Sequence, residues 1–292
     1  MHHTCNGAQW FAAADDKLLF QALAQGAGLP VPKLLAIHHP VRRMPRAVAL
    51  STAEEIANFL RRAPAWPLFV KPVDGMFSLG AARIDSYSAE TDELTFLDGT
   101  RGKVDGFARE LADCASGHLI QECLRPHPEI AAAIGDRVST VRIFCLLTPE
   151  GPHLIRAAWK IPTGSNVADN FWRPGNMLGA VDLESGEVRR VVQGVAKDQA
   201  VNSSHPDTGR PLVGMRLPLW QETRELCKTA ALLLPGIRTQ GWDIAICRDG
   251  PVLVEVNFGG DLNLAQLAWG AGMLDDRYRK HLRDCGYRRK VS

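Results

Sequence analysis

Two carboxylates and one amide beside a predicted β-hairpin are the residues of this chain best suited to metal chemistry. Two apolar runs flank residues 248–251, and alternating apolar residues around Asp-Gly predict a hairpin of two half-buried strands. Glu255 and Asn257 are two residues apart on the second strand, so their side chains leave on the same face. Asp243 opens the first strand and can lie beside them. These hard oxygen ligands predict a Mg²⁺ site, because magnesium keeps few protein ligands and fills its octahedron with water and phosphate oxygens.

An ordinary surface hairpin is the alternative for the same residues. Alternation of polar and apolar side chains is the rule in strands with one solvated face, so spacing alone does not separate the two interpretations. The metal site is favoured because the rest of the chain supplies the other parts of a nucleotide site in a consistent order.

Lys71 and the loop that follows it are candidates for binding phosphate. Lys71 ends an apolar strand, and the next residues include Asp74, Gly75 and Ser78. Glycine lets backbone N–H groups approach phosphate oxygens, and lysine supplies a compact positive charge. Neither a Walker A motif nor GxGxxG is present. An exposed lysine on a surface hairpin is therefore the competing interpretation.

The stretch 118–126 has the pattern of a buried strand that leaves the first half of the chain. Its extended backbone can offer N–H and C=O groups to an adenine edge, with apolar walls beside them. Leu124 and Ile120 would supply these walls, so Leu124 is a candidate for nucleotide binding. Any strand fits this description, so the signal gains weight only together with the others.

Two charged residues stand inside otherwise apolar strands. Arg142 lies within residues 139–147 and Lys160 within residues 154–162. A buried cation requires an anionic partner. The structural alternative is pairing with a carboxylate such as Asp136 or Glu122. The functional interpretation is that both cations face phosphate and offset the charge that develops during its transfer.

Two further loops carry candidate residues. Residues 164–182 are rich in Gly, Asn and aromatic residues and are predicted to lie over the site. The loop 205–214 contains one histidine. The candidates for contact with substrate or phosphate in the first loop are Asn170, Arg173 and Asn176. His205 is the most reactive residue of the second loop, and a purely structural role is the favoured alternative for it.

Composition limits the class of protein. The 292 residues are 46% hydrophobic, enough for one large domain or two lobes, and no apolar run reaches the length of a membrane span. A net charge of +2 gives no reason to expect nucleic acid as a partner. Seven scattered cysteines include no CxxC, and no Cys/His cluster has the spacing of zinc ligands. Reduced thiols and the lack of a secretory signal predict a cytoplasmic protein.

The order of predicted elements indicates an α+β architecture. Helices are predicted over 15–27, 52–62, 104–115 and 218–234, and the first turn of the second carries a capping box formed by Ser51 and Glu54. The second half of the chain is rich in strands, and connections are of the hairpin type. We predict two lobes, with residues 1–120 forming the N-terminal region and smaller lobe and residues 121–292 the larger lobe with the metal site.

Taken together, these motifs resemble the ATP-grasp superfamily, and the resemblance extends roughly from residue 15 to residue 270. Residues 15–37 and LVEVNFGGDLN resemble parts of D-alanine–D-alanine ligases. STVRIF, DNFWRPGN, HPDTG and GWDIAI are closer to the sugar-transfer-associated ATP-grasp group, near alpha-L-glutamate-ligase-like proteins. The family implies two α+β lobes that hold ATP between antiparallel sheets. Few residues precede Lys71, so the separate N-terminal substrate domain of the ligases is expected to be largely missing.

The resemblance also implies roles for individual residues. Lys71 and Lys160 would contact the phosphates of ATP, and Arg142 would neutralise the transferred phosphoryl group or the acyl phosphate. The segment 121–124, with Gln121, Glu122 and Leu124, would form the adenine hinge. Asp243, Glu255 and Asn257 would hold the metal ions. The ligases place an arginine close to the first metal aspartate, whereas this chain has Gly241 and Trp242 there. The site of the substrate therefore does not carry over.

Three functions remain open at this point. The leading one is an ATP- and Mg²⁺-dependent ligase that makes an acyl phosphate from a small carboxylate and joins it to an amine or another nucleophile. The second is a kinase that phosphorylates a hydroxyl of a small molecule or sugar with the same site. The third is a nucleotide-binding scaffold without turnover, against which the intact set of metal ligands argues.

Overall fold

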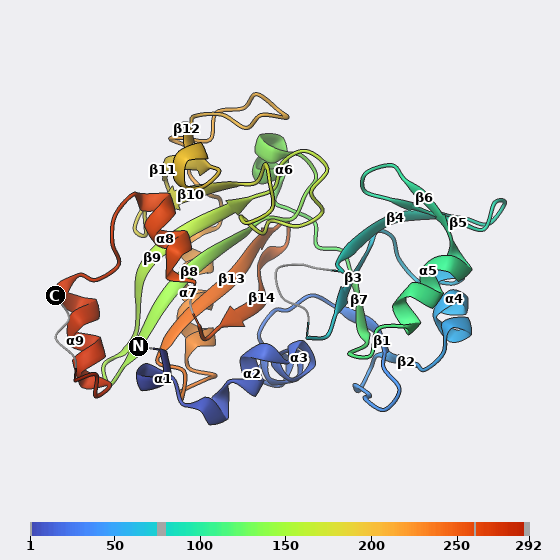
Figure 1. The fold of residues 1–292 in the computed structure, drawn as a ribbon, viewed down its shortest axis with the longest axis horizontal. Coiled ribbons are helices and arrows are strands. Elements are labelled where there is room, and N and C mark those ends of the chain that lie inside the picture. The colour runs from blue at the N-terminus through green and yellow to red at the C-terminus, as the bar shows by residue number, and fades with distance from the viewer. Residues whose placement is uncertain (1, 75–79, 260, 289–292) are drawn as a thin grey trace. The chain divides into compact units, whose positions relative to one another are not determined.

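The computed structural model describes residues 2–74, 80–259 and 261–288. The chain divides into two compact units. The larger unit comprises Met1–Val31 and Arg125–Ser292, and the smaller unit comprises Pro32–Leu124. Both are drawn in Figure 1, and each is described by itself.

The larger unit is built on one seven-stranded sheet. Its strands are β8 (Thr140–Thr148), β9 (Gly151–Ile161), β10 (Met177–Val181), β11 (Val188–Gln193), β12 (Ala200–Asn202), β13 (Thr239–Cys247) and β14 (Gly250–Asn257). Their order is β12-β11-β10-β9-β8-β13-β14, and every neighbouring pair is antiparallel. Every residue of β13 is buried, because neighbouring strands and helices cover this strand on all sides.

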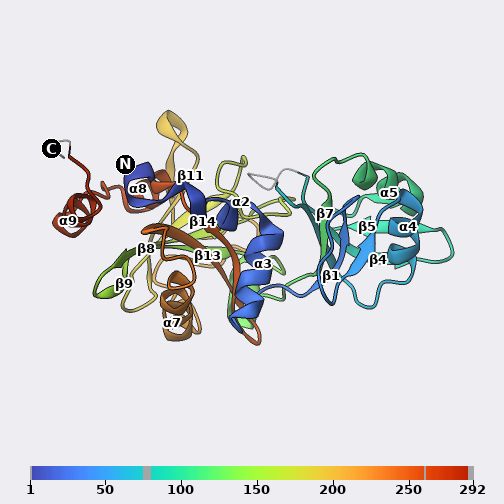
Figure 2. The ribbon, with the colours of Figure 1, turned by 90° about the horizontal axis from the view of Figure 1, so that it is seen from below.

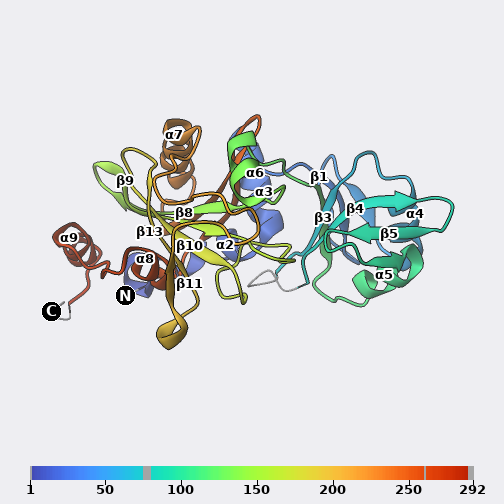
Figure 3. The same cartoon turned by 90° about the horizontal axis from the view of Figure 1, so that it is seen from above.

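Helices cover both faces of this sheet, with α7 and α8 on opposite faces in Figures 2 and 3. One face packs its apolar side chains, including Trp159 and Trp242, against α3, α6 and α7. The other packs Phe144 and Leu178 against α8 and α9. The helices of the larger unit are α1 (His2–Cys5), α2 (Ala12–Asp15), α3 (Lys17–Gly26), α6 (Pro128–Ile134), α7 (Trp220–Ala231), α8 (Leu262–Trp269) and α9 (Asp276–Asp284), with 3₁₀ turns η1 (Ala8–Trp10) and η2 (Ala196–Asp198).

The smaller unit is a second seven-stranded sheet with helices on one face. Its elements are β1 (Leu34–His38), β2 (Val48–Leu50), α4 (Ala53–Arg61), β3 (Leu68–Pro72), β4 (Ala82–Ser88), β5 (Glu93–Phe96), β6 (Arg101–Lys103), α5 (Val104–Ala112) and β7 (His118–Glu122). The strand order is β2-β1-β7-β3-β4-β5-β6, with β1 and β2 parallel and the other neighbours antiparallel. Leu68, Val70 and Ile120 pack against α4 and α5.

Both units mix helices with mainly antiparallel strands, as the sequence predicted, but one detail differs. The capping box at the start of α4 uses Thr52 and Glu55 rather than Ser51 and Glu54. The first 31 residues, which belong to the predicted N-terminal region, pack with the larger unit. Their place follows from contacts that the sequence does not reveal, such as Phe20 and Ala24 of α3 in the core with Trp242.

The hairpin that carries the predicted metal ligands is present. Strands β13 and β14 pair in antiparallel register and are joined by a tight turn at residues 248–249. Gly250 has φ +131°, which a residue with a side chain adopts only with strain, so glycine suits this turn. Among the described residues, no helix is both long and apolar enough to span a lipid bilayer.

Candidate functional site

Register across three strands aligns the central residues of the candidate site. Arg142 on β8 lies directly opposite Asp243 on β13, and Asp243 lies directly opposite Glu255 on β14. Directly opposite residues project from the same face of a sheet, so the three side chains form a row. This is the face that α8 covers, because Phe144, the next residue of β8 on that side, packs in the core with α8.

Asp243 is the centre of a buried ion-pair cluster. The Arg142 guanidinium donates from Nε to Oδ1 at 2.5 Å and from Nη2 to Oδ2 at 2.8 Å. Lys160 on β9 donates from Nζ to Oδ2 at 2.9 Å. The side chains of Arg142 and Asp243 are 5% and 1% exposed. Asp243 is therefore the shared partner of both buried cations.

Electrostatics separate the two carboxylates of the cluster. Burial disfavours the charged form of Asp243, but the neighbouring Arg142 and Lys160 charges more than offset it, so the pKa of Asp243 lies well below its usual range. Burial, together with the negative charge of Asp243, raises the pKa of Glu255. Asp243 is thus held as an anion, whereas the raised pKa of Glu255 makes its carboxylate easier to protonate.

A third carboxylate, which the sequence did not single out, completes the cluster. Asp169 lies 3.4 Å from Lys160 Nζ and accepts from both the backbone N–H and the hydroxyl of Thr140 at 2.6 Å. It lies in the loop predicted to cover the site, where Asn170 was chosen instead. The need of a buried lysine for a counterion was the signal that could have identified Asp169.

The oxygen atoms of Asp243, Glu255 and Asn257 suit Mg²⁺, but the three residues are not equivalent, because Asp243 is already paired with Arg142 and Lys160. The side chain of Glu255 is 36% exposed and lies 3.9 Å from Arg142 Nη2. Asn257 Nδ2 is 3.4 Å from Glu255 Oε1, so these two residues are adjacent on one face. Asp243 Oδ2 accepts from both Arg142 and Lys160, whereas Oδ1 accepts from Arg142 and keeps a second lone pair. Glu255 and Asn257 would therefore be the primary ligands, with Asp243 beside them.

One nitrogen of Arg142 is unsatisfied in a way that points to an anion. Nη1 is fully buried and has no hydrogen-bond partner among the described residues. A buried N–H group without an acceptor is costly, and a charged one more so. An oxygen of a bound anion would satisfy it at the place where Glu255 and Asn257 could hold a metal.

Gly241 makes room for Arg142. It lies opposite Asn257, and a Cβ at this position would lie 3.1 Å from Arg142 Cδ. The Arg142 stem therefore lies against the backbone of β13 where any side chain would intrude.

We expect Gly241→Ala to destabilise the protein by about 1–3 kcal/mol, because the two bonds to Asp243 prevent Arg142 from moving away. Urea unfolding measures the change. Gly26→Ala in α3 is the control, since nothing lies within 4 Å of a Cβ there. Equal stability of the two variants would contradict the tight packing of Arg142.

The predicted nucleotide-binding residues belong to the smaller unit. Lys71 on β3 and Gln121 on β7 share the face of the sheet opposite the hydrophobic core, because Lys71 pairs with Leu119, two residues from Gln121. Asp74 is exposed just after β3, and Glu122 forms an ion pair with Lys33 at 2.6 Å. Leu124 is half-buried at the end of the unit.

Gly75 and Ser78, the other two residues predicted to bind phosphate, lie outside the described residues. The phosphate loop is thus represented by Lys71 and Asp74 alone.

The loop candidates fall into two groups. Asn176 is buried and holds the loop together: it accepts from Thr163 N–H and Asn166 Nδ2 and donates to the carbonyls of Ala168 and Asn170. His205 is fully buried, with Nε2 3.0 Å from the Pro162 carbonyl. These contacts indicate structural roles.

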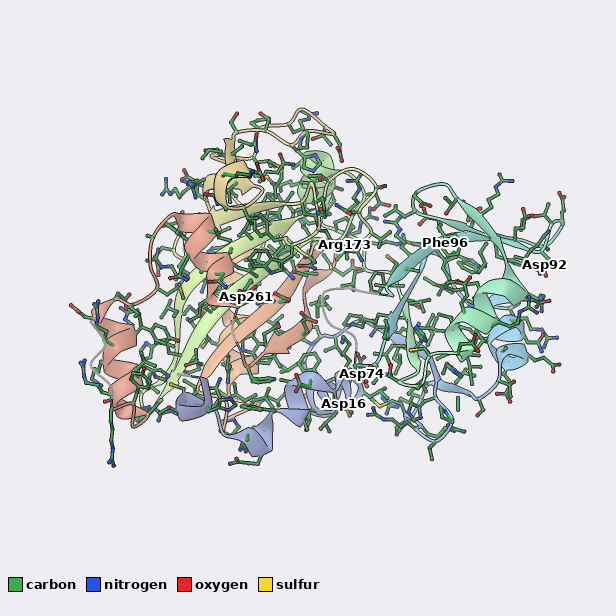
Figure 4. All side chains as sticks on the ribbon, viewed as in Figure 1. Asp16, Asp74, Asp92, Phe96, Arg173 and Asp261 are labelled. Atoms are coloured by element: carbon green, nitrogen blue, oxygen red, sulfur yellow. The ribbon has the colours of Figure 1, made fainter. Side chains whose placement is uncertain are left out.

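The rest of this loop reaches the start of α8. Trp172 Nε1 donates to Asp261 at 2.9 Å, and Asp261 lies beside α8 in Figure 4, which also labels Arg173 of the same loop. Asn170 and Arg173 therefore stay candidates for contact with a ligand.

Comparison with known proteins identifies the family to which this chain belongs. The sequence model of the sugar-transfer-associated ATP-grasp family matches residues 2–280. The chain therefore belongs to this ATP-grasp family, which confirms the resemblance inferred from its motifs. Among curated proteins, no sequence matches.

Solved structures share the fold at low sequence identity. D-alanine–D-alanine ligase from Bacillus anthracis is 11% identical, with a TM-score of 0.51 over 96% of this chain and 71% of that one. D-alanyl-alanine synthetase A from Vibrio cholerae O1 is also 11% identical, with a TM-score of 0.52 over 96% and 66%. These likenesses confirm the α+β ATP-grasp fold.

The chain is shorter than several structures that it matches. It spans 43% of the length of an L-amino acid ligase from Bacillus licheniformis, with 12% identity, 89% of this chain covered and a TM-score of 0.44. It likewise spans 46% of the N5-carboxyaminoimidazole ribonucleotide synthetase purK, at 13% identity over 86% of this chain and a TM-score of 0.48.

Proposed function

We propose that this protein is an ATP- and Mg²⁺-dependent ligase that activates a small carboxylate as an acyl phosphate and joins it to an amine or another nucleophile. The observation that carries the proposal is the buried Arg142 guanidinium, whose Nη1 has no partner among the described residues and whose Nη2 lies 3.9 Å from Glu255, the neighbour of Asn257. A cationic donor next to hard oxygen ligands suits an anion that arrives with a metal ion. Membership of an ATP-grasp family supports ATP as that anion.

The larger unit would handle the reacting phosphate. Glu255 and Asn257, with Asp243, would hold Mg²⁺, which when bound supplies positive charge to phosphate oxygens. Arg142 Nη1 would donate to an oxygen of the transferred phosphoryl group. The other two nitrogens of the guanidinium, Nε and Nη2, each donate to Asp243, so the guanidinium is oriented before the ligand binds.

Lys160 would act mainly through the charge balance of this unit. It is bound by Asp243 and Asp169, which fix its position and raise its pKa above the usual value despite burial. It therefore stays protonated and adds positive charge to the phosphate site.

The smaller unit would bind the nucleotide. Lys71 would contact phosphate oxygens, and Asp74, Gly75 and Ser78 would belong to the loop over them. The backbone of Gln121, Glu122 and Leu124 would face the adenine edge. Lys71 and Gln121 lie on the same face of their sheet, which supports a shared ligand.

Such a site needs positioned charge and no nucleophilic side chain. The γ-phosphoryl group passes from ATP to the substrate carboxylate, and attack of the nucleophile on the acyl carbon then expels phosphate. Arg142 and Lys160 would offset the charge that moves with the phosphoryl group, and Mg²⁺, when bound, would add positive charge there. Transfer to a hydroxyl would use the same charges, so a kinase is the alternative outcome of the test.

The test follows oxygen from the acid into phosphate. The protein is incubated with ATP, Mg²⁺ and panels of small acids, amines and sugars, with the acids labelled with ¹⁸O in the carboxyl group. Ligation transfers one labelled oxygen to the released phosphate and gives a product whose mass equals both substrates minus water. Phosphate that stays on a sugar product would replace the ligase proposal with a kinase. Nucleotide binding without turnover on any panel would favour a scaffold.

A further inference from the structure

Two cysteines and a histidine from the two ends of the chain meet in the larger unit. Cys5 ends α1, His281 lies in α9, and Cys285 follows the last turn of α9. Cys5 Sγ, Cys285 Sγ and a ring nitrogen of His281 all lie within 4.8 Å of one another. Helices α1 and α9 lie close together in Figures 1 and 3. The sequence showed no zinc-type cluster, because 276 or more positions separate Cys5 from the other two residues.

The distance between the two ligand atoms at α9 matches tetrahedral coordination, and Cys5 Sγ lies within 4.8 Å of both. His281 Nε2 and Cys285 Sγ are 3.6 Å apart. In a tetrahedral zinc site, bonds of about 2.3 Å to sulfur and about 2.05 Å to nitrogen place these atoms roughly 3.6 Å apart. His281 in α9 and Cys285 just after it are four residues apart, so both side chains lie on the same side of the helix.

The backbone around Cys5 is fixed independently of any metal. The next residue, Asn6, donates from Nδ2 to the Thr239 carbonyl at 3.0 Å and accepts from Thr239 N–H at 2.9 Å. Thr239 begins β13, and its hydroxyl lies 3.2 Å from His281 Nε2. Cys5 is therefore held against the sheet at the position that faces α9.

Burial and access are both suited to a bound ion. Cys5 and His281 are 4% and 2% exposed, so a bound ion would be shielded from water. Cys285 is partly exposed and leaves a route of entry. The Tyr278 ring stacks near the His281 ring, with centroids 6.3 Å apart, and helps to orient the imidazole. His281 Nδ1 has no hydrogen-bond partner among the described residues, so packing rather than a second hydrogen bond orients the ring.

We propose that Cys5, His281 and Cys285 form a Zn²⁺ site that fastens the N-terminal segment to the C-terminal helix. Thiolate and imidazole ligands select zinc over magnesium, so this site is chemically distinct from the oxygen ligands at Glu255. Binding displaces the thiol protons, and a water molecule beside the Thr239 hydroxyl takes the fourth position. The proposal does not depend on the ligase activity.

The experiment titrates the reduced, metal-free full chain with Zn²⁺ and, separately, with Co²⁺. We expect one ion per chain, a thiolate-to-cobalt charge-transfer band, and visible bands of tetrahedral intensity. Zn²⁺ should also raise the melting temperature, because it binds the folded state. Cys5→Ser and Cys285→Ser should each weaken binding at least about tenfold and abolish the cobalt bands.

Matched controls separate this site from other ligands. Cys114→Ser removes a partly exposed cysteine of the smaller unit and should leave binding unchanged. Glu255→Gln should also keep the zinc, which separates this result from the fate of the ligase proposal. All variants are made in a background with His2→Ala and His3→Ala, so that the two histidines next to each other in sequence do not contribute.

Three results would overturn the proposal. The first is the absence of stoichiometric zinc binding, and the second is zinc binding that survives loss of both Cys5 and Cys285. The third is a Cys5–Cys285 disulfide, found by peptide mass mapping of air-oxidised protein, together with no metal binding by the reduced chain. A disulfide without metal binding would show that Cys5 and Cys285 form a redox pair rather than a metal site.

Discussion

Glu255→Gln lowers the rate of ATP turnover by roughly 10²–10³-fold, the loss typical of removing one charge-stabilising group, while the protein stays folded. Glutamine keeps the size of the side chain and a hydrogen-bonding oxygen near Asn257 but removes the charge that would hold Mg²⁺. Because Glu255 is 36% exposed and 3.9 Å from Arg142, its neutralisation leaves the Arg142–Asp243 pair intact. Phosphate release at saturating ATP measures the rate, and circular dichroism with thermal melting measures folding.

The control for this variant is Glu184→Gln. Glu184 pairs with Arg224 in the same unit, but its side chain is 82% exposed, so its neutralisation should leave turnover unchanged. Raising the Mg²⁺ concentration should partly restore the rate of Glu255→Gln and have no effect on Glu184→Gln. Turnover of Glu255→Gln equal to that of the unmodified protein would contradict the assignment of Glu255 to the metal.

Local patterns in the sequence predicted the parts of the site that lie within one hairpin. Glu255 and Asn257 were placed on one face by their two-residue spacing, and Asp243 beside them by the turn between the strands. Such inferences succeed because side-chain direction along a strand alternates regardless of the rest of the fold. The same kind of reasoning placed the cap of α4 one residue too early, because two adjacent residues, Ser51 and Thr52, both suit an N-cap.

Contacts between distant strands could not be predicted in this way. Arg142 and Lys160 were identified as buried cations, but their shared partner depends on the strand order β9-β8-β13-β14, which brings together residues 101 and 83 positions apart. Asp169 was missed because a loop has no periodicity that fixes where its side chains point. Cys5 and Cys285 were not predicted to share a site, because they lie far apart in the sequence and only the fold brings them together.

Loss of Arg142 is expected to have the largest effect on stability. Arg142→Met fills most of the same volume but leaves Asp243 with Lys160 alone, in a cluster that also contains Asp169 and Glu255. Removing one partner of a buried ion pair typically costs about 3–5 kcal/mol, because the remaining charge stays buried. Urea unfolding followed by tryptophan fluorescence reports mainly on the larger unit, because Trp66 alone among the tryptophans lies in the smaller one.

Two further variants decide whether the uncompensated charge of Asp243 is the cause. Arg189→Met on β11 removes an arginine from the same sheet, but its side chain is 51% exposed and pairs with Glu187 at the surface, so it should cost less than about 1 kcal/mol. Arg142→Met combined with Asp243→Leu should recover much of the loss, because the charge of Asp243 is removed and Lys160 keeps Asp169 as its counterion. If the double variant is as unstable as the sum of its single changes, the pair is not coupled and Arg142 stabilises the sheet through packing alone.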